Sequence, residues 1–219
     1  MARVKSYAVI GMGGFGTSVA RNLAQEGMEV MIIDIHKDKI NAISSEVTHA
    51  LQLDVTNEIA MKNIGLENMD GVIIAIGEKL EVSVMATIIC KEIGVPLVIV
   101  KTETGLQKKI LEKVGADQVI LPETESGYRL AKNITGNFID FFNLSNQMSI
   151  AEMSVRPEWL GKSLKELNLR SRYHINILSV QQAGEDIPDG FPDPDEPFRE
   201  GDIVIIAGKN EDIQKINDH

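Results

Sequence analysis

Three glycines spaced as G-x-G-x-x-G, at Gly11, Gly13 and Gly16, give the chain its first sign of chemistry. They follow an apolar run at residues 7–10 and precede a helical pattern. In that setting the first glycine permits a tight turn, the second lets the main chain approach a diphosphate, and the third allows close packing of helix on strand. Free N–H groups at the positive end of the helix would then donate to phosphate.

An acidic residue, Asp34, ends the next apolar run at residues 29–34 and lies eighteen residues beyond Gly16. A carboxylate there can accept both hydroxyls of an adenosine ribose and repels a 2′-phosphate. NAD or a plain adenine nucleotide is therefore favoured over NADP. A structural glycine turn that binds no ligand is the alternative.

The remaining candidates for ligand contact follow the other predicted strands, because ligands bind at the carboxyl ends of strands in such sheets. We expect Asp54 to frame the adenine, Gly77 to permit close approach and Lys101 to reach a phosphate. With the loop residues beside the three glycines, the further candidates are Gly14, Phe15, Ile35, Asp54, Val55, Ala75, Ile76, Gly77 and Lys101.

Val- and Ile-rich runs alternate with amphipathic helical patterns over the first 122 residues. Strands are predicted at residues 7–10, 29–34, 50–53, 71–76, 97–100 and 118–121. Helices are predicted at residues 14–26, 37–45, 58–64, 81–93 and 106–114. Continuous apolar strands alternating with helices indicate a parallel sheet covered on both faces. The prediction is an α/β fold with a doubly wound, six-stranded Rossmann-type sheet.

The rest of the chain predicts a long helix and a small α+β domain. The helix, at residues 125–142, is rich in large apolar residues and is either a final packing helix or one lying on a partner subunit. After a composition shift, strands are predicted at residues 149–154, 175–181 and 202–208 and helices at 162–167 and 211–217. The loop at residues 184–202, with four prolines and eight carboxylates, is typical of a solvated connection.

Composition excludes several classes of function. The net charge of −10, without a cluster of Lys and Arg, argues against nucleic acid as a partner. No apolar stretch reaches the ~20 residues that span a bilayer, and the first residues do not resemble a secretory signal. The single cysteine, Cys90, excludes an internal disulfide and reads as inert core.

No catalytic constellation is visible, so we expect a protein that is not an enzyme. The four histidines are scattered, and neither an H-E-x-x-H pair nor a Tyr-x-x-x-Lys pair occurs. A regulatory protein needs no such groups, because a ligand acts there through its different affinity for two conformations. An NAD-dependent oxidoreductase and a stand-alone nucleotide or redox sensor are the alternatives.

Several segments together resemble a known family. They are residues 8–16, 30–34, 72–77, 114–123, 160–164, 167–170 and 201–208. They are similar to the RCK, or KTN, regulatory subunits of bacterial Ktr and Trk potassium uptake systems, with the Ktr (KtrA-like) branch nearest. The resemblance covers nearly the whole chain in the right order and is much more specific than the glycine motif.

This resemblance implies a nucleotide-binding RCK-N domain at residues 1–122, a crossover helix and linker at 123–144 and an RCK-C domain at 145–219. It also implies a homodimer that assembles into an octameric ring beneath a potassium-translocating membrane subunit (KtrB/TrkH-like). ADP or ATP would shift the ring between conformations and gate transport. The chain would be cytoplasmic and peripheral at the inner face of the cell membrane.

The resemblance also implies roles for particular residues. Asp34 matches the ribose ligand and Lys101 a pocket residue. Glu123 matches a carboxylate near the phosphates and a bound cation, either divalent or Na⁺. In the RCK-C domain, relatives bind cyclic di-AMP. The matching region here holds Arg170, Tyr173, His174 and Asn176, but Lys165 stands where relatives often carry an apolar residue.

One departure from the family pattern concerns the glycine loop. KtrA-like proteins commonly read G-x-G-R-F-G, and the arginine meets the terminal phosphate of ATP from across the dimer. This chain has Gly14 at that position. The loss of a charge-assisted contact worth ~1.5 to 3 kcal/mol should weaken discrimination of ATP from ADP. ADP, AMP and NAD(H) therefore stay open as ligands.

Overall fold

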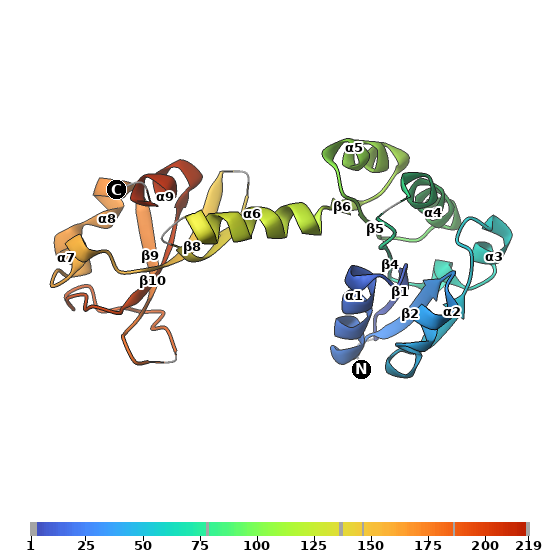
Figure 1. Cartoon of the computed structure of the whole chain (residues 1–219), viewed down its shortest axis with the longest axis horizontal. Helices are drawn as coiled ribbons and strands as arrows, with labels where there is room; N and C mark the ends of the chain where they lie inside the picture. Colours follow the sequence, from blue (N-terminus) through green and yellow to red (C-terminus); the bar gives the residue numbers. More distant parts are fainter. Residues whose placement is uncertain (1–3, 78, 136–137, 146, 186, 218–219) are drawn as a thin grey trace. The chain divides into compact units, whose positions relative to one another are not determined.

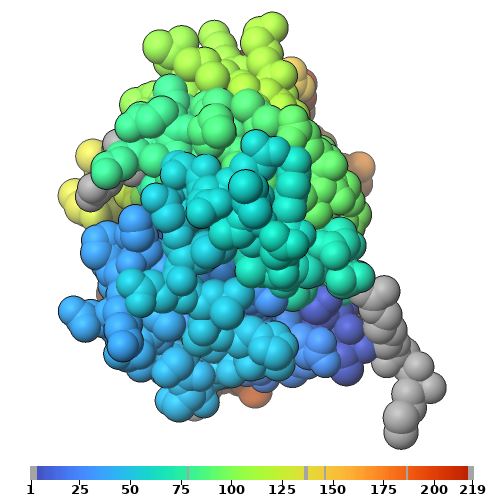
Figure 2. Space-filling model, turned by 90° about the vertical axis from the view of Figure 1, so that its right-hand side faces the viewer, coloured from blue at the N-terminus to red at the C-terminus, as the bar shows by residue number. Residues whose placement is uncertain are grey.

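The chain forms two compact units, Met1–Thr124 and Glu125–His219 (Figure 1). The computed structural model describes residues 4–77, 79–135, 138–145, 147–185 and 187–217. The first unit runs from blue to green in Figure 1, and in the space-filling view its atoms form one continuous body on the face shown (Figure 2).

A six-stranded parallel sheet forms the centre of the first unit, in the order β3-β2-β1-β4-β5-β6. The strands are β1 Ser6–Ile10, β2 Glu29–Asp34, β3 His49–Gln52, β4 Gly71–Ile74, β5 Val98–Lys101 and β6 Gln118–Ile120. The order reverses between β1 and β4, which are neighbours although two strands intervene in the sequence. This arrangement confirms the doubly wound α/β fold and creates a crevice at the carboxyl ends of β1 and β4.

Helices cover both faces of this sheet. They are α1 Gly14–Gln25, α2 Lys37–Asn41, α3 Glu58–Lys62, α4 Leu80–Ile93 and α5 Gly105–Val114, with single 3₁₀ turns at Ser44–Glu46 and Leu66–Asn68. Successive residues of a strand point to opposite faces. Ala8 and Ile10 of β1 therefore join the core under α3, α4 and α5, and Val9 joins the core under α1 and α2.

Cys90 lies on the buried face of α4 with no exposed surface. Burial raises the pKa of its thiol to about 12, because the low-dielectric core disfavours the thiolate. The thiol is therefore protonated and shielded, as the sequence predicted for a core cysteine.

A four-stranded antiparallel sheet forms the second unit, in the order β7-β8-β10-β9. The strands are β7 Phe138–Asn143, β8 Met148–Ser154, β9 Ile175–Gln181 and β10 Ile203–Lys209. The helices are α6 Pro122–Thr135, which begins at the end of the first unit, α7 Leu164–Leu167, α8 Leu169–Tyr173 and α9 Asn210–Asn217, with a 3₁₀ turn at Pro157–Trp159. A separate apolar core, with Trp159 fully enclosed, stabilises this unit.

The prediction of one helix over residues 125–142 is wrong in its second half. Helix α6 ends at Thr135, and Phe138–Asn143 form strand β7, paired with β8. The aromatic residues favour a strand because Phe138 and Phe141 bury their rings in the core of the second unit. Residues 136–137 lie outside the described part of the chain. None of the residues in α6 is buried, and Tyr128, Leu130 and Ile134 are exposed.

Other elements differ from the predictions at their ends. The helix predicted at residues 37–45 breaks after Asn41 into the 3₁₀ turn at Ser44–Glu46. The helix predicted from residue 162 begins at Leu164, because Ser163 and Glu166 form a reciprocal capping box. The short helix α8 was not predicted at all. Its five residues show too little periodicity to be separated from a loop.

Gly16 is the residue on which the packing of α1 against β1 depends. A Cβ atom at this position would lie 1.9 Å from the carbonyl oxygen of Gly11, which is backbone and cannot rotate away. We therefore expect Gly16→Ala to destabilise the protein by about 1–3 kcal/mol through overpacking. Urea unfolding followed by circular dichroism measures the change.

Gly127→Ala provides the matched control, because a Cβ atom at Gly127 meets nothing within 4 Å and Gly127 lies in helix α6. It should leave the stability unchanged or raise it by up to ~1 kcal/mol, since alanine is the better helix former. Equal unfolding midpoints for Gly16→Ala and the wild type would contradict the packing role.

Candidate functional site

A cavity of about 600 Å³ opens at the carboxyl ends of the first five strands. Of the predicted ligand contacts, it brings together Gly11, Gly13, Gly14, Asp34, Ile35, Asp54, Val55, Ala75, Ile76, Gly77, Lys101 and Glu123. Phe15 and Gly16 do not line it. Phe15 packs against the core under α1, and Gly16 is buried where the helix meets the glycine loop.

The glycine loop presents the start of α1 to this cavity. Gly13 precedes the first turn and no side chain caps the helix there. The first N–H groups of a helix have no intrahelical partner, so this end carries donors and partial positive charge. A Cβ atom at Gly13 or Gly14 would meet nothing within 4 Å, which leaves open space beside those donors.

Gly11 sets the backbone conformation of the turn that directs the glycine loop toward the cavity. Its φ of 93° lies in the left-handed region, which favours glycine. Its N–H donates to the carbonyl of Ile33 at 2.8 Å, and the N–H of Ala75 donates to the carbonyl of Ile10 at 2.7 Å. The end of β1 is thus held between its two neighbouring strands, directly below the cavity.

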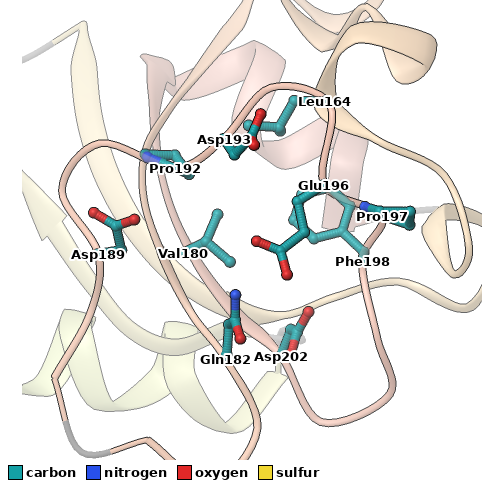
Figure 3. A pocket seen from close by; sticks show the side chains of 10 residues that line it. All are labelled: Leu164, Val180, Gln182, Asp189, Pro192, Asp193, Glu196, Pro197, Phe198 and Asp202. Carbon is teal, nitrogen blue, oxygen red and sulfur yellow. The ribbon is translucent and has the colours of Figure 1, made fainter.

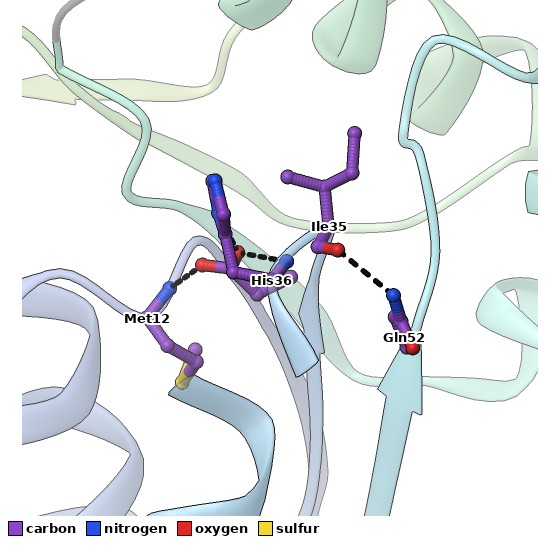
Figure 4. A network of polar contacts seen from close by, with 5 residues as sticks. Met12, Ile35, His36 and Gln52 are labelled. Atoms are coloured by element: carbon purple, nitrogen blue, oxygen red, sulfur yellow. Dashed lines mark hydrogen bonds and ion pairs between the residues drawn. The ribbon is translucent and has the colours of Figure 1, made fainter. Parts of the chain in front are cut away.

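Asp34 anchors the opposite side of the loop through contacts with Met12 and His36, two of the residues labelled in Figure 4. Its Oδ2 accepts the N–H of Met12 at 2.7 Å, and its Oδ1 accepts the N–H of His36 at 2.8 Å. Only 7% of the residue is exposed. Burial by itself would raise the pKa of Asp34. The N–H groups of His36 and Met12, the His36 ring and the ammonium of Lys39 more than offset this effect and hold the pKa below its usual value.

Lys101, the last residue of β5, also lines the cavity. Its Nζ is 2.6 Å from Oε1 of Glu123, and the side chains are 11% and 61% exposed. The hydrogen bond from Lys101 holds the pKa of Glu123 below its usual value. A Cβ atom at Gly77 would come within 2.9 Å of both Lys101 Nζ and Glu103 Oε1, so the missing side chain makes room for these two charges.

Asp54 follows β3 and lines the cavity, with an apolar residue on either side of it in the chain. Its Oδ1 accepts from the backbone N and the hydroxyl of Thr56 at 2.9 and 2.7 Å. Those hydrogen bonds lower the pKa of Asp54 despite partial desolvation, and the charge of Lys79 adds to the effect. Ile35 and Val55 supply apolar surface beside this carboxylate.

Several polar residues of the cavity were missed by the sequence analysis. They are His36, Lys39, Thr56, Lys79 and Glu103. His36, Thr56, Lys79 and Glu103 each follow a predicted site residue by two positions, on the loop that leaves the same strand. The signal was therefore present, but a loop residue can point toward or away from a crevice and spacing does not decide which.

The cavity lacks a cluster of metal ligands. Among the described residues, no group of three or more His, Cys, Asp or Glu could hold a metal ion. Glu123 is instead paired with Lys101. A cation at Glu123 would therefore need ligands beyond the described carboxylates and imidazoles, such as water.

The second unit has a much smaller pocket of about 30 Å³ (Figure 3). It lies between β9, α7 and the carboxylate-rich loop that leads from β9 to β10. Its lining residues include Asp189, Asp193, Glu196 and Asp202. The four residues matched to cyclic di-AMP binding do not line it. Arg170, His174 and Asn176 are exposed and Tyr173 is half-buried on α8 and the start of β9.

Helices of membrane-spanning length and apolarity do not occur in the part of the chain that the structure describes.

Comparison with protein families assigns both units. Residues 7–122 match the TrkA-N domain and residues 150–219 match the TrkA-C domain. The Ktr system potassium uptake protein C of Bacillus subtilis is 39% identical over 96% of this chain and 95% of its own length. The Ktr system potassium uptake protein A of the same organism is 35% identical over 98% and 97%, and that of Vibrio alginolyticus is 32% identical over 95% and 94%.

Solved structures agree in fold. The RCK domain of GsuK superimposes with a TM-score of 0.68 over 99% of this chain at 15% identity, and this chain spans 47% of the length of that one. A GsuK channel bound to NAD gives 0.67 over 96% of this chain, again at 15% identity, and 38% of that chain is covered.

Two consecutive domain matches and Ktr relatives at 32–39% identity over nearly the full length agree with the six-stranded parallel sheet and the separate antiparallel unit. The chain therefore belongs to the TrkA-N/TrkA-C (RCK) family of regulatory proteins of Ktr and Trk potassium uptake systems.

Proposed function

We propose that this chain is a nucleotide-binding regulatory subunit that gates a potassium-translocating membrane protein through a ligand-dependent conformational change. The observation that carries the proposal is the buried Asp34 carboxylate beside an uncapped helix end in the cavity of the first unit. Similarity to Ktr proteins over nearly the full length supports potassium uptake as the system in which the pocket acts.

The lining of the cavity supports binding of an adenine nucleotide. Asp34 would accept ribose hydroxyls, and Ile35 would cover one face of the adenine near Asp54. The phosphates would lie on the N–H groups at Gly13 and Gly14, where the helix end favours anions and no side chain intervenes. Lys101, released from Glu123, would neutralise part of the phosphate charge.

The charges at the phosphate end favour a diphosphate over a triphosphate. One lysine, Lys101, stands there with two carboxylates, Glu103 and Glu123, and Gly14 adds no cation. A third phosphate would meet more negative charge than positive unless a cation at Glu123 or a second chain compensates. We therefore propose ADP as the preferred ligand over ATP, with NAD(H) as the alternative. GsuK structures bound to NAD and to ADP come from the same fold class.

The second unit is proposed to take a separate ligand. Arg170, His174 and Asn176 are exposed where α8 leads into the edge strand β9. An exposed arginine and amide beside the half-buried Tyr173 are suited to a phosphate and a base, as in cyclic di-AMP. Lys165, on α7, counts against this ligand, because it stands where relatives often carry an apolar residue and its exposed ammonium is paired with Asp195.

The exposed apolar residues of α6 support an assembly of several copies. Tyr128, Leu130 and Ile134 are exposed along this helix, which suits burial against a second copy. We propose a homodimer that builds an octameric ring, cytoplasmic and held at the inner face of the membrane by the potassium-translocating subunit. The net charge of −10 makes nucleic acid an unsuitable partner.

An oxidoreductase is less well supported by the cavity. Hydride transfer to a substrate needs a proton donor near the nicotinamide, and among the described residues the cavity has no tyrosine or cysteine. Its one imidazole, His36, lies at the ribose end and contacts Asp34. Relatives that are regulatory proteins of potassium uptake favour a binding role.

Asp34→Ala should weaken ADP binding at least ~100-fold, because two charge-assisted hydrogen bonds to the ribose are lost together. Titration calorimetry measures the affinity, and circular dichroism checks the fold. Asp38→Ala, on the exposed surface of α2 outside the cavity, is the matched control and should bind normally. Unchanged affinity in the Asp34 variant would refute the pocket assignment.

Gly14→Arg should raise the preference for ATP over ADP by about tenfold, the worth of one charge-assisted contact to a terminal phosphate. The side chain has room, since a Cβ atom at Gly14 meets nothing within 4 Å. The ratio of the two dissociation constants is the readout, with Gly14→Gln as the uncharged control. The same ratio in the arginine variant and the wild type would contradict the assignment of Gly14 to the phosphate end.

The purified chain should sediment as a dimer or an octamer at micromolar concentration. Leu130→Glu together with Ile134→Glu should shift it toward smaller species, because buried like charges are costly at an apolar interface. Val4→Glu, at an exposed apolar residue of the first unit, serves as the control. A clean monomer for the wild type would contradict the ring.

A further inference from the structure

The ring of His36 contacts the carboxylate of Asp34, to which the proposed function assigns binding of the ribose hydroxyls. Its Nδ1 lies 2.9 Å from Oδ1 of Asp34 (Figure 4). An ionised carboxylate only accepts, so Nδ1 carries the proton in this contact. The ring is largely solvent-exposed, with 65% of the side chain accessible, whereas Asp34 is buried. An exposed donor therefore contacts a buried acceptor in the lining of the cavity.

Counting acceptor positions shows a conflict with the ligand. A carboxylate offers about four lone-pair sites. One site of Oδ2 takes the N–H of Met12, and both sites of Oδ1 take the N–H and the ring of His36. One site is left, but an adenosine ribose brings two neighbouring hydroxyl donors. The two backbone donors are fixed by the chain, so only the ring can give way.

We propose that His36 is a specificity-determining residue whose imidazole competes with one ribose hydroxyl for Asp34 and must leave before both hydroxyls can bind. The proposal rests on the proposed ribose role of Asp34. A protonated ring holds the carboxylate more strongly than a neutral one, because its hydrogen bond is charge-assisted at both ends. Nucleotide affinity is therefore lower where the imidazole is charged and rises as it loses its proton.

Other charges around the cavity do not produce this dependence. Asp34 contacts the ring, Lys39 acts on Asp34 and lines the same cavity, and Lys37 and Asp38 follow His36 in the chain. Asp54 and Lys79 come from the loops after β3 and β4, and Lys101, Glu103 and Glu123 stand at the proposed phosphate end. The glycine loop contributes no titratable side chain. Histidine is the side chain that ordinarily changes charge between pH 5 and 8, whereas carboxylates and lysines keep theirs.

Calorimetric titration with ADP at about pH 6 and about pH 8, across the range in which histidine titrates, tests the proposal. His36→Ala should bind ADP more tightly than the wild type at the lower pH, by roughly three- to tenfold, because no ion pair has to be broken. At the higher pH the two should differ less. Comparing the two proteins at each pH cancels the protonation of ADP itself. His49→Gln, an exposed histidine outside the cavity, should follow the wild type.

Nucleotides that lack one hydroxyl give a second readout. Either 2′-deoxy-ADP or 3′-deoxy-ADP lacks the hydroxyl that competes with the ring. For that nucleotide, the ratio of the dissociation constants of the wild type and His36→Ala should be the same at both pH values. If the ring had only a structural role, His36→Ala would bind ADP more weakly than the wild type. Weaker binding by His36→Ala, or an identical pH dependence of ADP affinity in the two proteins, would overturn the proposal. Tight ADP binding with no effect of His36 leaves the pocket assignment standing, whereas absence of ADP binding in every variant refutes both.

Discussion

The hydrogen bond from the N–H of Met12 to the carboxylate of Asp34 is the interaction on which the rest of the site depends. It joins the turn after β1 to the end of β2, and so fixes where the first N–H groups of α1 point. The carboxylate is buried, and a buried charge is tolerated only when its acceptor positions are filled. This requirement makes Asp34 a structural anchor for the loop, and the proposed ribose contact would use the same carboxylate.

The sheet order gathers the other groups of the cavity around this anchor. Because β1 lies between β2 and β4, the residues after these strands converge on one crevice, and β3 and β5 extend it on either side. Asp54 and Lys101, far apart in the sequence, thus line one cavity. Two apolar cores, one on each face of the sheet, hold the strand ends rigidly enough for loop residues to be aimed.

Much of the first unit could be predicted from its sequence because each strand is a continuous apolar run and most helices begin or end at glycine or at a capping residue. The strand at Glu29–Asp34 matches its predicted range residue for residue. In the second unit, the strand at Ile175–Gln181 does so too. The second half of the predicted helix at 125–142 failed, since Phe138 and Phe141 are three residues apart, a helix-like spacing. Both enter the same core because the pairing of β7 with β8 shifts register between Phe138 and Asp140, and local periodicity does not contain that contact. Loop residues such as His36 and Glu103 were missed for a similar reason, because their direction is set by neighbouring strands.

The ion pair between Lys101 and Glu123 has a mechanical consequence. Glu123 is the second residue of α6, and the boundary between the two compact units falls after Thr124, within the first turn of that helix. In the proposed function, a phosphate bound by Lys101 would free Glu123, in the first turn of α6, from its ion pair. Occupancy of the pocket would then change how firmly the start of this helix is held, with no need for the sheet itself to deform.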